Sequence, residues 1–309
     1  MKLAIKFWEF IREREAIRLR RAAGQPAPWT EDKILRAYKF TNVKREHDRT
    51  SVALKAIYDQ HVLRASDRVV WLNCALYRLF GTAEMAAALG WVRAWGDESH
   101  RRSQVLRLAA TRLATGQRVF TGAYIVPNCG RTRPKHEVVC SIVDGVWKAA
   151  PELCDRAMDR WELAVGVLTQ LWGIGSFIAK EIVLDYVMAT GWRPSDWQTW
   201  TPIGPGARRG AMRVLDGKLI HPHGLSEHYA LKVCRELYTQ RRDQWEDWWS
   251  TANHAAVFSD EVRRSRNYNQ LPPHSHLDLT DIQFQLCEFD KYQRALRGEG
   301  RPRSRFTPT

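Results

Sequence analysis

Apolar residues recur three or four positions apart along most of the chain, and this spacing predicts a mainly α-helical protein. The stretch from Gly24 to Pro28 breaks the first helix, and Thr30 is the expected N-cap of the second. The predicted helices cover residues 3–22, 31–40, 48–64, 67–80, 83–95, 98–115, 208–215, 226–250 and 280–296. A further helical pattern runs from residue 153 to residue 187.

Two short stretches depart from this pattern. Residues 119–127 are β-prone and contain a glycine, and residues 138–143 form a second run rich in β-branched side chains. Either the two runs pair as a small β hairpin, or the second begins a buried helix. The predicted fold class is mainly α, with the small hairpin left open.

A glycine pair interrupts the helical pattern at Gly173-Ile174-Gly175. Two glycines around an apolar residue allow a tight turn, and Ser176 is the expected N-cap of the following helix. The free N–H groups at such a helix start bind phosphate well. The pattern therefore predicts a helix-hairpin-helix contact with the DNA backbone. The residues assigned to this contact are Gly173, Gly175, Ser176 and Lys180.

Charge supports a polyanionic partner. The 309 residues carry a formal net charge of +14, which favours nucleic acid. The six cysteines form no C-x-x-C pair, which argues against a zinc ribbon or an iron–sulfur cluster. The two H-x-H pairs at residues 221–223 and 274–276 are expected to be solvated. We therefore expect no metal and no cofactor.

The cysteine pattern suits a reducing cytoplasm. The N-terminus lacks the features of a signal peptide, and no run of about 18 apolar residues is present to span a membrane. Tryptophan is abundant, and spacing such as that of Trp245, Trp248 and Trp249 predicts core packing for most of the 14. A minority could stack on an extruded base.

Several segments together resemble a known family. They are residues 38–49, 120–125, 172–182, 204–210, and 281–292 with 298–303. They look like the α-glutamyl/putrescinyl thymine pyrophosphorylase family and the related helical domain of 5-hydroxymethyl-deoxyuridine DNA kinases. The first and last segments are the most specific.

The resemblance implies a glycosylase-like helix-hairpin-helix fold over residues 29–305, as one domain of one or two lobes. A basic helix at 1–28 would precede it, and a tail at 306–309 would follow. The implied function is hypermodification of thymine in a phage-infected bacterium. There, 5-hydroxymethyluracil in DNA is phosphorylated or pyrophosphorylated, and an amine or amino acid then replaces the phosphate.

This chemistry needs cations around the leaving phosphate, a carboxylate to take the proton of the amine, and a base extruded from the duplex. On a helix, Arg45 and Arg49 would share a face. The predicted phosphate-binding residues are Arg45, Arg49, Arg209, Lys291 and Arg301. The predicted catalytic residues are Asp48, Asp196, Arg208, Glu288 and Asp290.

Two other functions remain open. A DNA glycosylase would use Asp196 by its spacing after the hairpin, although alignment on the next helix places Arg208 there instead. A non-catalytic module would bring a separate P-loop kinase to modified DNA, since the sequence contains no G-x-x-x-x-G-K-[ST] motif. The expected partners are double-stranded DNA with modified thymine, an amine or amino acid, and that kinase, without a membrane.

Overall fold

The computed structural model describes residues 1–96, 100–122, 130, 132–155, 159–250, 276–300 and 305–306. These residues are mainly helical, which confirms the predicted fold class, and they include no β-strand. They form two compact units, one from Met1–Arg45 and Gln198–Thr309 and the other from Glu46–Trp197. Within the described ranges, no helix combines the length and the hydropathy that a membrane span requires.

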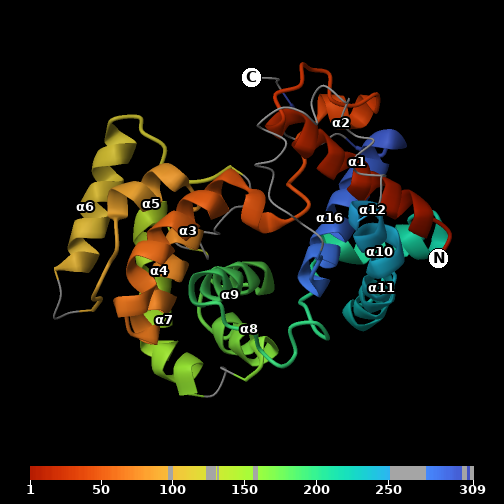
Figure 1. Cartoon of the computed structure of the whole chain (residues 1–309). Coiled ribbons are helices and arrows are strands. Elements are labelled where there is room, and N and C mark those ends of the chain that lie inside the picture. Colours follow the sequence, from red (N-terminus) through yellow and green to blue (C-terminus); the bar gives the residue numbers. More distant parts are fainter. Residues whose placement is uncertain are drawn as a thin grey trace. The chain divides into compact units, whose positions relative to one another are not determined.

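The first unit is built on one long helix near the end of the chain. Helix α16 (Leu279–Leu296, blue in Figure 1) packs against α10 (Pro205–Asp216), α11 (Glu227–Thr239), α1 (Ala4–Ala22) and α2 (Lys33–Ala37). A π-helical turn at Arg242–Glu246 leads into α12 (Asp247–Ser250). The core shared by these elements contains the predicted tryptophan cluster of Trp245, Trp248 and Trp249.

Two glycines allow α10 and α16 to pack at close range. A Cβ atom at Gly210 would overlap the carbonyl group of Leu286, and one at Gly206 would overlap the sulfur of Cys287. Both glycines come from the sequence Gly204-Pro-Gly-Ala-Arg-Arg-Gly210, which forms the start of α10. Their role here is to let two helices approach, which only a residue without a side chain permits.

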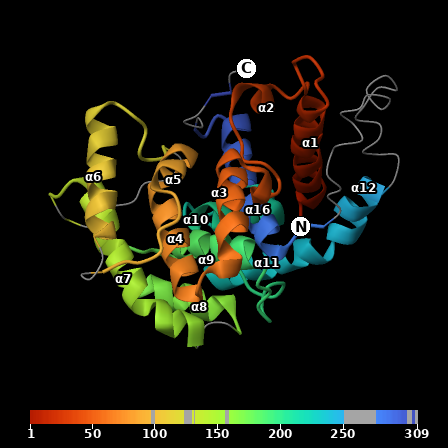
Figure 2. The same ribbon diagram turned by 60° about the vertical axis from the view of Figure 1, so that its left-hand side comes forward.

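The second unit is also helical. It contains α3 (Arg49–His61), a 3₁₀ turn at Val62–Arg64, α4 (Asp67–Phe80), α5 (Ala83–Leu89), α6 (Arg101–Ala114), α7 (Lys135–Asp155), α8 (Trp161–Thr169) and α9 (Ser176–Thr190). Helix α4 contacts α7 and α9, as the two views in Figures 1 and 2 show. Arg78 on α4 forms buried ion pairs with Glu181 and Asp185 on α9, which joins these two helices through their charges.

The structure decides between the two readings of residues 138–143. They lie inside α7, where Val139, Cys140 and Val143 are buried at helical spacing. The β hairpin that would include them is therefore wrong, because burial of one helix face outweighed local β propensity. Residues 123–127 of the other predicted strand lie outside the described residues.

Several predicted helix ends need correction. Asp32, not Thr30, caps α2, since its Oδ1 accepts from the backbone N–H groups of Ile34 and Leu35. Gly175, not Ser176, is the N-cap of α9. Helix α2 covers only part of the predicted 31–40, and α5 ends at Leu89 instead of residue 95. Sequence periodicity locates helices better than it locates their ends.

Candidate functional site

One face of α16 holds the segment that contains residues 39–43. The Nε2 of Gln285 donates to the carbonyl oxygen of Val43 at 2.8 Å, 242 positions away in sequence. Lys291 donates from Nζ to the carbonyl oxygen of Lys39. Gln285 and Lys291 are six positions apart, and Glu288 lies three positions from each, so neighbouring members of this row share a face of α16 and can bind the segment along the helix. Residues 39–43 of the first family-like segment therefore lie beside the last segment, on α16.

Glu288, between these two residues on α16, completes the same face. Its Oε2 accepts from the backbone N–H of Thr41 at 3.4 Å and from Lys291 Nζ at 3.1 Å. Its side chain is only 13% exposed. Two of the predicted site residues, Glu288 and Lys291, thus act together in positioning the backbone of residues 39–41.

Arg14 of α1 is a member of this site that the sequence reasoning missed. Its buried guanidinium donates to Oε1 of Gln285 and to the carbonyl oxygen of Thr41. It also lies over the rings of Phe10 and Phe40, at 4.8 and 5.7 Å from their centroids. The available signal was an arginine on the apolar face of a helix, because a buried arginine is rare without a dedicated set of partners.

A second network joins α16 to α10. Asp290 is 2% exposed and accepts from Nε of Arg209 and from Nε of Arg213, each at 2.8 Å. Arg213 is fully buried and also bonds Glu299. Arg209 and Asp290, predicted to bind phosphate and to move a proton, thus bind each other here. Arg213 was missed, although it lies four positions after Arg209 on the same helix face.

Ion pairing shifts the pKa values of Arg213 and Glu299 in this network. Burial alone would lower the pKa of Arg213, but hydrogen bonds to Glu299 and Asp290 outweigh it and raise the pKa. The hydrogen bond from Arg213 lowers the pKa of Glu299, against a smaller opposing effect of burial. Both partners are therefore held firmly in their charged forms.

Arg208 lies beside this network on α10. Its Nε donates to the carbonyl oxygen of Leu225 at 2.6 Å, and its side chain is half-buried. Gly224, with φ of +76°, packs against the backbone of Arg208 so closely that a Cβ atom would overlap it. The turn before α11 thereby fixes the direction in which Arg208 leaves its helix.

The predicted charge run at residues 44–49 is divided between different elements. Arg45 begins a 3₁₀ turn and lies over the ring of Phe284, 5.0 Å from its centroid. Asp48 is extended, at φ −68° and ψ 138°, and α3 begins only at Arg49. The prediction that Arg45 and Arg49 share a helix face is therefore wrong. Arg49 is 88% exposed and pairs with Glu84 at 3.4 Å.

Asp196 has a structural position in the second unit. Its Oδ1 accepts from the backbone N–H of Trp161 at 2.9 Å, and its Oδ2 from that of Glu162 at 3.0 Å. The side chain is buried. Both oxygens thus cap the N-terminus of α8, the role that a carboxylate at a helix start fulfils well.

The residues predicted to contact DNA lie in the turn between α8 and α9 and at the start of α9. Gly173 has φ of +82°, a conformation that favours glycine, while Gly175 is extended. Gly175 and Ser176 are exposed, but Lys180 is buried and its Nζ lies 3.9 Å from Glu181. The helix start is thus accessible, whereas the lysine belongs to the interior of the unit. Arg301, the remaining predicted residue, lies outside the described residues.

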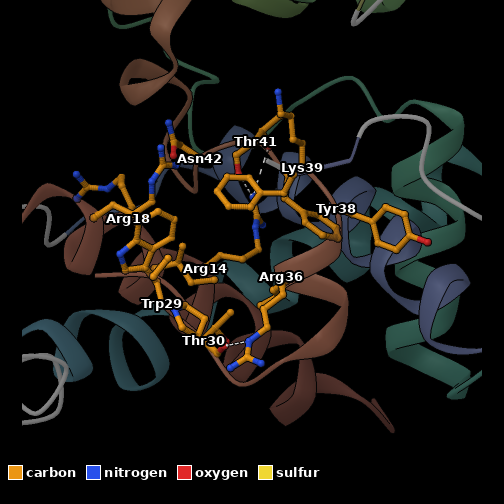
Figure 3. A pocket seen from close by; sticks show the side chains of 16 residues that line it. Arg14, Arg18, Trp29, Thr30, Arg36, Tyr38, Lys39, Thr41 and Asn42 are labelled. Atoms are coloured by element: carbon orange, nitrogen blue, oxygen red, sulfur yellow. Dashed lines mark hydrogen bonds between the residues drawn. The ribbon is translucent and has the colours of Figure 1, made fainter. Parts of the chain in front are cut away.

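A pocket of about 630 Å³ lies in the first unit, beside the segment that α16 holds. Tyr38, Lys39 and Thr41 line it in Figure 3, with Arg18 and Trp29 on the opposite side. Its volume is in the range of about 300–1,000 Å³ that is common for small-molecule sites. The first of the two most specific family-like segments thus contributes side chains to a pocket and backbone groups to the contact with α16.

Comparison with known proteins decides the family. The family described as "5-hmdU DNA kinase, helical domain" matches residues 2–301. The chain belongs to this family. The resemblance proposed from the five sequence segments is thereby confirmed, and it extends to the N-terminal helix.

A curated relative carries the same name. The protein named "5-hmdU DNA kinase" from Bacillus phage SP10 is 28% identical over 231 residues, covering 68% of this chain and 36% of the relative. The chain therefore matches little more than a third of that relative's length. No solved structure matches the chain.

Proposed function

We propose that this chain modifies thymine in DNA by exchanging the phosphate of a phosphorylated 5-hydroxymethyluracil for an amine or an amino acid. The observation that carries the proposal is family membership, together with the meeting of the two most specific segments on one helix face. The basic chain suits a DNA substrate, and the exposed turn at Gly175 suits a phosphate of its backbone.

The proposed reaction balances without a cofactor. The amine nitrogen forms a bond to the 5-methylene carbon, and the bond from that carbon to the phosphate oxygen breaks. The electron pair leaves with the phosphate or pyrophosphate, and the nitrogen loses one proton to a base. Arginine and lysine side chains would stabilise the leaving anion, and a carboxylate would accept the proton.

Among Asp196, Glu288 and Asp290, Glu288 is our choice for the proton acceptor. Both carboxylate oxygens of Asp290 bind guanidinium groups, and both of Asp196 bind backbone N–H groups at the start of α8. Among the described residues, the contacts of Glu288 use Oε2, which leaves Oε1 to accept a proton. Glu288 lies at the segment 39–41, next to Lys291. On the same reasoning, the position of Asp196 gives the glycosylase alternative no support.

One observation favours a second candidate. The matched family is described as a helical domain of a DNA kinase, and the phage relative is much longer than the matched part. A domain of this kind could deliver a kinase to modified DNA without reacting itself.

Mass spectrometry of nucleosides separates these functions. DNA with phosphorylated 5-hydroxymethyluracil would be incubated with the chain and a pool of amino acids and polyamines. The transferase predicts a new nucleoside with an intact sugar–base bond and phosphate release only when an amine is present. A glycosylase would leave abasic sites, and a delivery module would bind the DNA without either product. Absence of any new nucleoside with every amine would refute the transferase.

A further inference from the structure

The pocket in Figure 3 combines cationic and aromatic side chains, and the described residues that line it include no carboxylate. The rings that line it are Trp29, Tyr38, Phe40 and Phe306. The cations that line it are Arg14, Arg18, Arg21, Arg36 and Lys39. A wall of this composition fits a ligand that has both a planar ring and a negative charge.

Three of the cations are fixed in place. Arg14 is held by Gln285 and Thr41, as described above. Arg18 donates from Nε to both carboxylate oxygens of the buried Glu15, at 3.0 Å each. Arg36 donates to the carbonyl oxygen of Thr30. Their guanidinium groups are thus positioned before a ligand arrives, which lowers the cost of binding.

Within the part of the chain that the structure describes, the other two cations are not held in this way. Arg21 is exposed and lies 5.1 Å from the ring centroid of Trp29 and 5.5 Å from that of Phe306. The side chain of Lys39 is exposed as well. Across the described residues, neither of these two is paired with a carboxylate. Both are available to an anion that enters the pocket.

The aromatic side of the pocket is also held in position. The indole N–H of Trp29 donates to the carbonyl oxygen of Gln25 at 2.7 Å. Phe306 packs against it edge to face, with ring centroids 6.0 Å apart. A fixed indole beside an arginine is a common platform for a nucleic-acid base, since every base has a π face and stacking is worth about 1–3 kcal/mol per base.

We propose that this pocket binds a single nucleotide, with its base against the aromatic wall and its phosphate against Arg21 and Lys39. Inorganic phosphate alone would leave the rings unused, and a neutral apolar ligand would leave the cations unused. The ligand is either a free nucleotide or one nucleotide of a DNA strand. The second source rests on the proposed function, where the phosphate is the one on the 5-methylene group.

Isothermal titration calorimetry with thymidine 5′-monophosphate and with thymidine tests the ligand class. The nucleotide is expected to bind at least about tenfold more tightly, because only it can form charge-assisted hydrogen bonds. Lys39→Ala is expected to weaken nucleotide binding by about tenfold and to leave the fold intact, since this side chain is exposed. Lys218→Ala removes an exposed lysine of the same unit outside the pocket lining and is the matched control.

A second set of titrations distinguishes a free nucleotide from a nucleotide within a DNA strand. Short single strands containing 5-phosphomethyl-deoxyuridine or 5-hydroxymethyl-deoxyuridine would be titrated in the same way. Preference for the phosphorylated strand over thymidine 5′-monophosphate supports a nucleotide within DNA, and the reverse preference supports a free nucleotide. The proposal is overturned if no nucleotide or strand binds, if phosphate makes no difference, or if Lys39→Ala binds like Lys218→Ala.

Failure of the pocket assignment and failure of the transferase proposal would give different results in the binding and product assays. If the wild-type chain forms no amine product while its nucleotide binding depends on Lys39, the pocket stands and the transferase fails. If Lys39→Ala retains both product formation and nucleotide affinity, the transferase stands and the pocket assignment fails.

Discussion

Replacement of Asp290 by asparagine is predicted to destabilise the first unit strongly. Asp290 is 2% exposed and bridges Nε of Arg209 and Nε of Arg213, each at 2.8 Å. Asparagine keeps the shape but removes the charge. Among the described residues, the fully buried Arg213 would then have only the partly exposed Glu299 as an ionic partner. Breaking a buried ion pair from one side costs about 3–5 kcal/mol.

Urea unfolding of the full chain, followed by tryptophan fluorescence, would measure this loss. The unit contains the buried Trp8 and Trp245, so its unfolding changes the signal. Glu31→Gln is the matched control, because Glu31 is 92% exposed and pairs with Arg36 at 2.8 Å in the same unit. The control should cost no more than about 1 kcal/mol. A loss below about 1 kcal/mol for Asp290→Asn would refute the reasoning that this carboxylate supports the α10–α16 contact.

Three further predictions concern separate elements. Gly175→Ala should preserve stability, because Gly175 is extended and an added Cβ atom would meet none of the described residues within 4 Å. The same variant should weaken DNA binding in a filter-binding titration if a phosphate approaches this backbone. Unchanged affinity would exclude that contact. The pKa of Glu299 is lowered chiefly by its hydrogen bond from Arg213, so the stabilising effect of this carboxylate is present at neutral pH and is lost as the pH falls below about 4.5. Glu299→Gln should therefore flatten the acidic part of the curve of unfolding free energy against pH. An unaltered curve would contradict the pairing with Arg213. Asp196→Ala should cost about 1–2 kcal/mol in thermal unfolding through loss of the α8 cap, and no change would argue against the capping role.

The sequence was a good guide to the main elements and to part of the site. Apolar periodicity predicted the helices because one face of each helix is buried. The segments 38–49 and 281–292 contain residues that contact each other in the structure, since Gln285, Glu288 and Lys291 bind the backbone of residues 39–43. It could not show that Asp290 and Arg209 bind each other, since that contact joins helices 81 positions apart. Local propensity likewise could not decide between a strand and a buried helix at residues 138–143, because burial against α4 is a tertiary effect.

The missed residues share a physical cause. Arg14 and Arg213 are buried cations whose partners come from distant parts of the chain, so neither forms a motif by itself. The pocket was missed for the same reason, because it gathers side chains from α1, the segment 27–42 and Phe306. Sequence patterns show which residues favour binding an anion, whereas the fold determines which of them surround the same space.

The central claim is that the chain joins an amine to phosphorylated 5-hydroxymethyluracil in DNA. Its most direct test supplies such DNA with ¹⁵N-labelled glycine or putrescine, digests it to nucleosides and measures their masses. The account predicts a labelled nucleoside in one of these reactions, with one phosphate or pyrophosphate released for each label incorporated and none released without the amine. Unlabelled nucleosides throughout, over a series that extends to the other amino acids and polyamines, would contradict it.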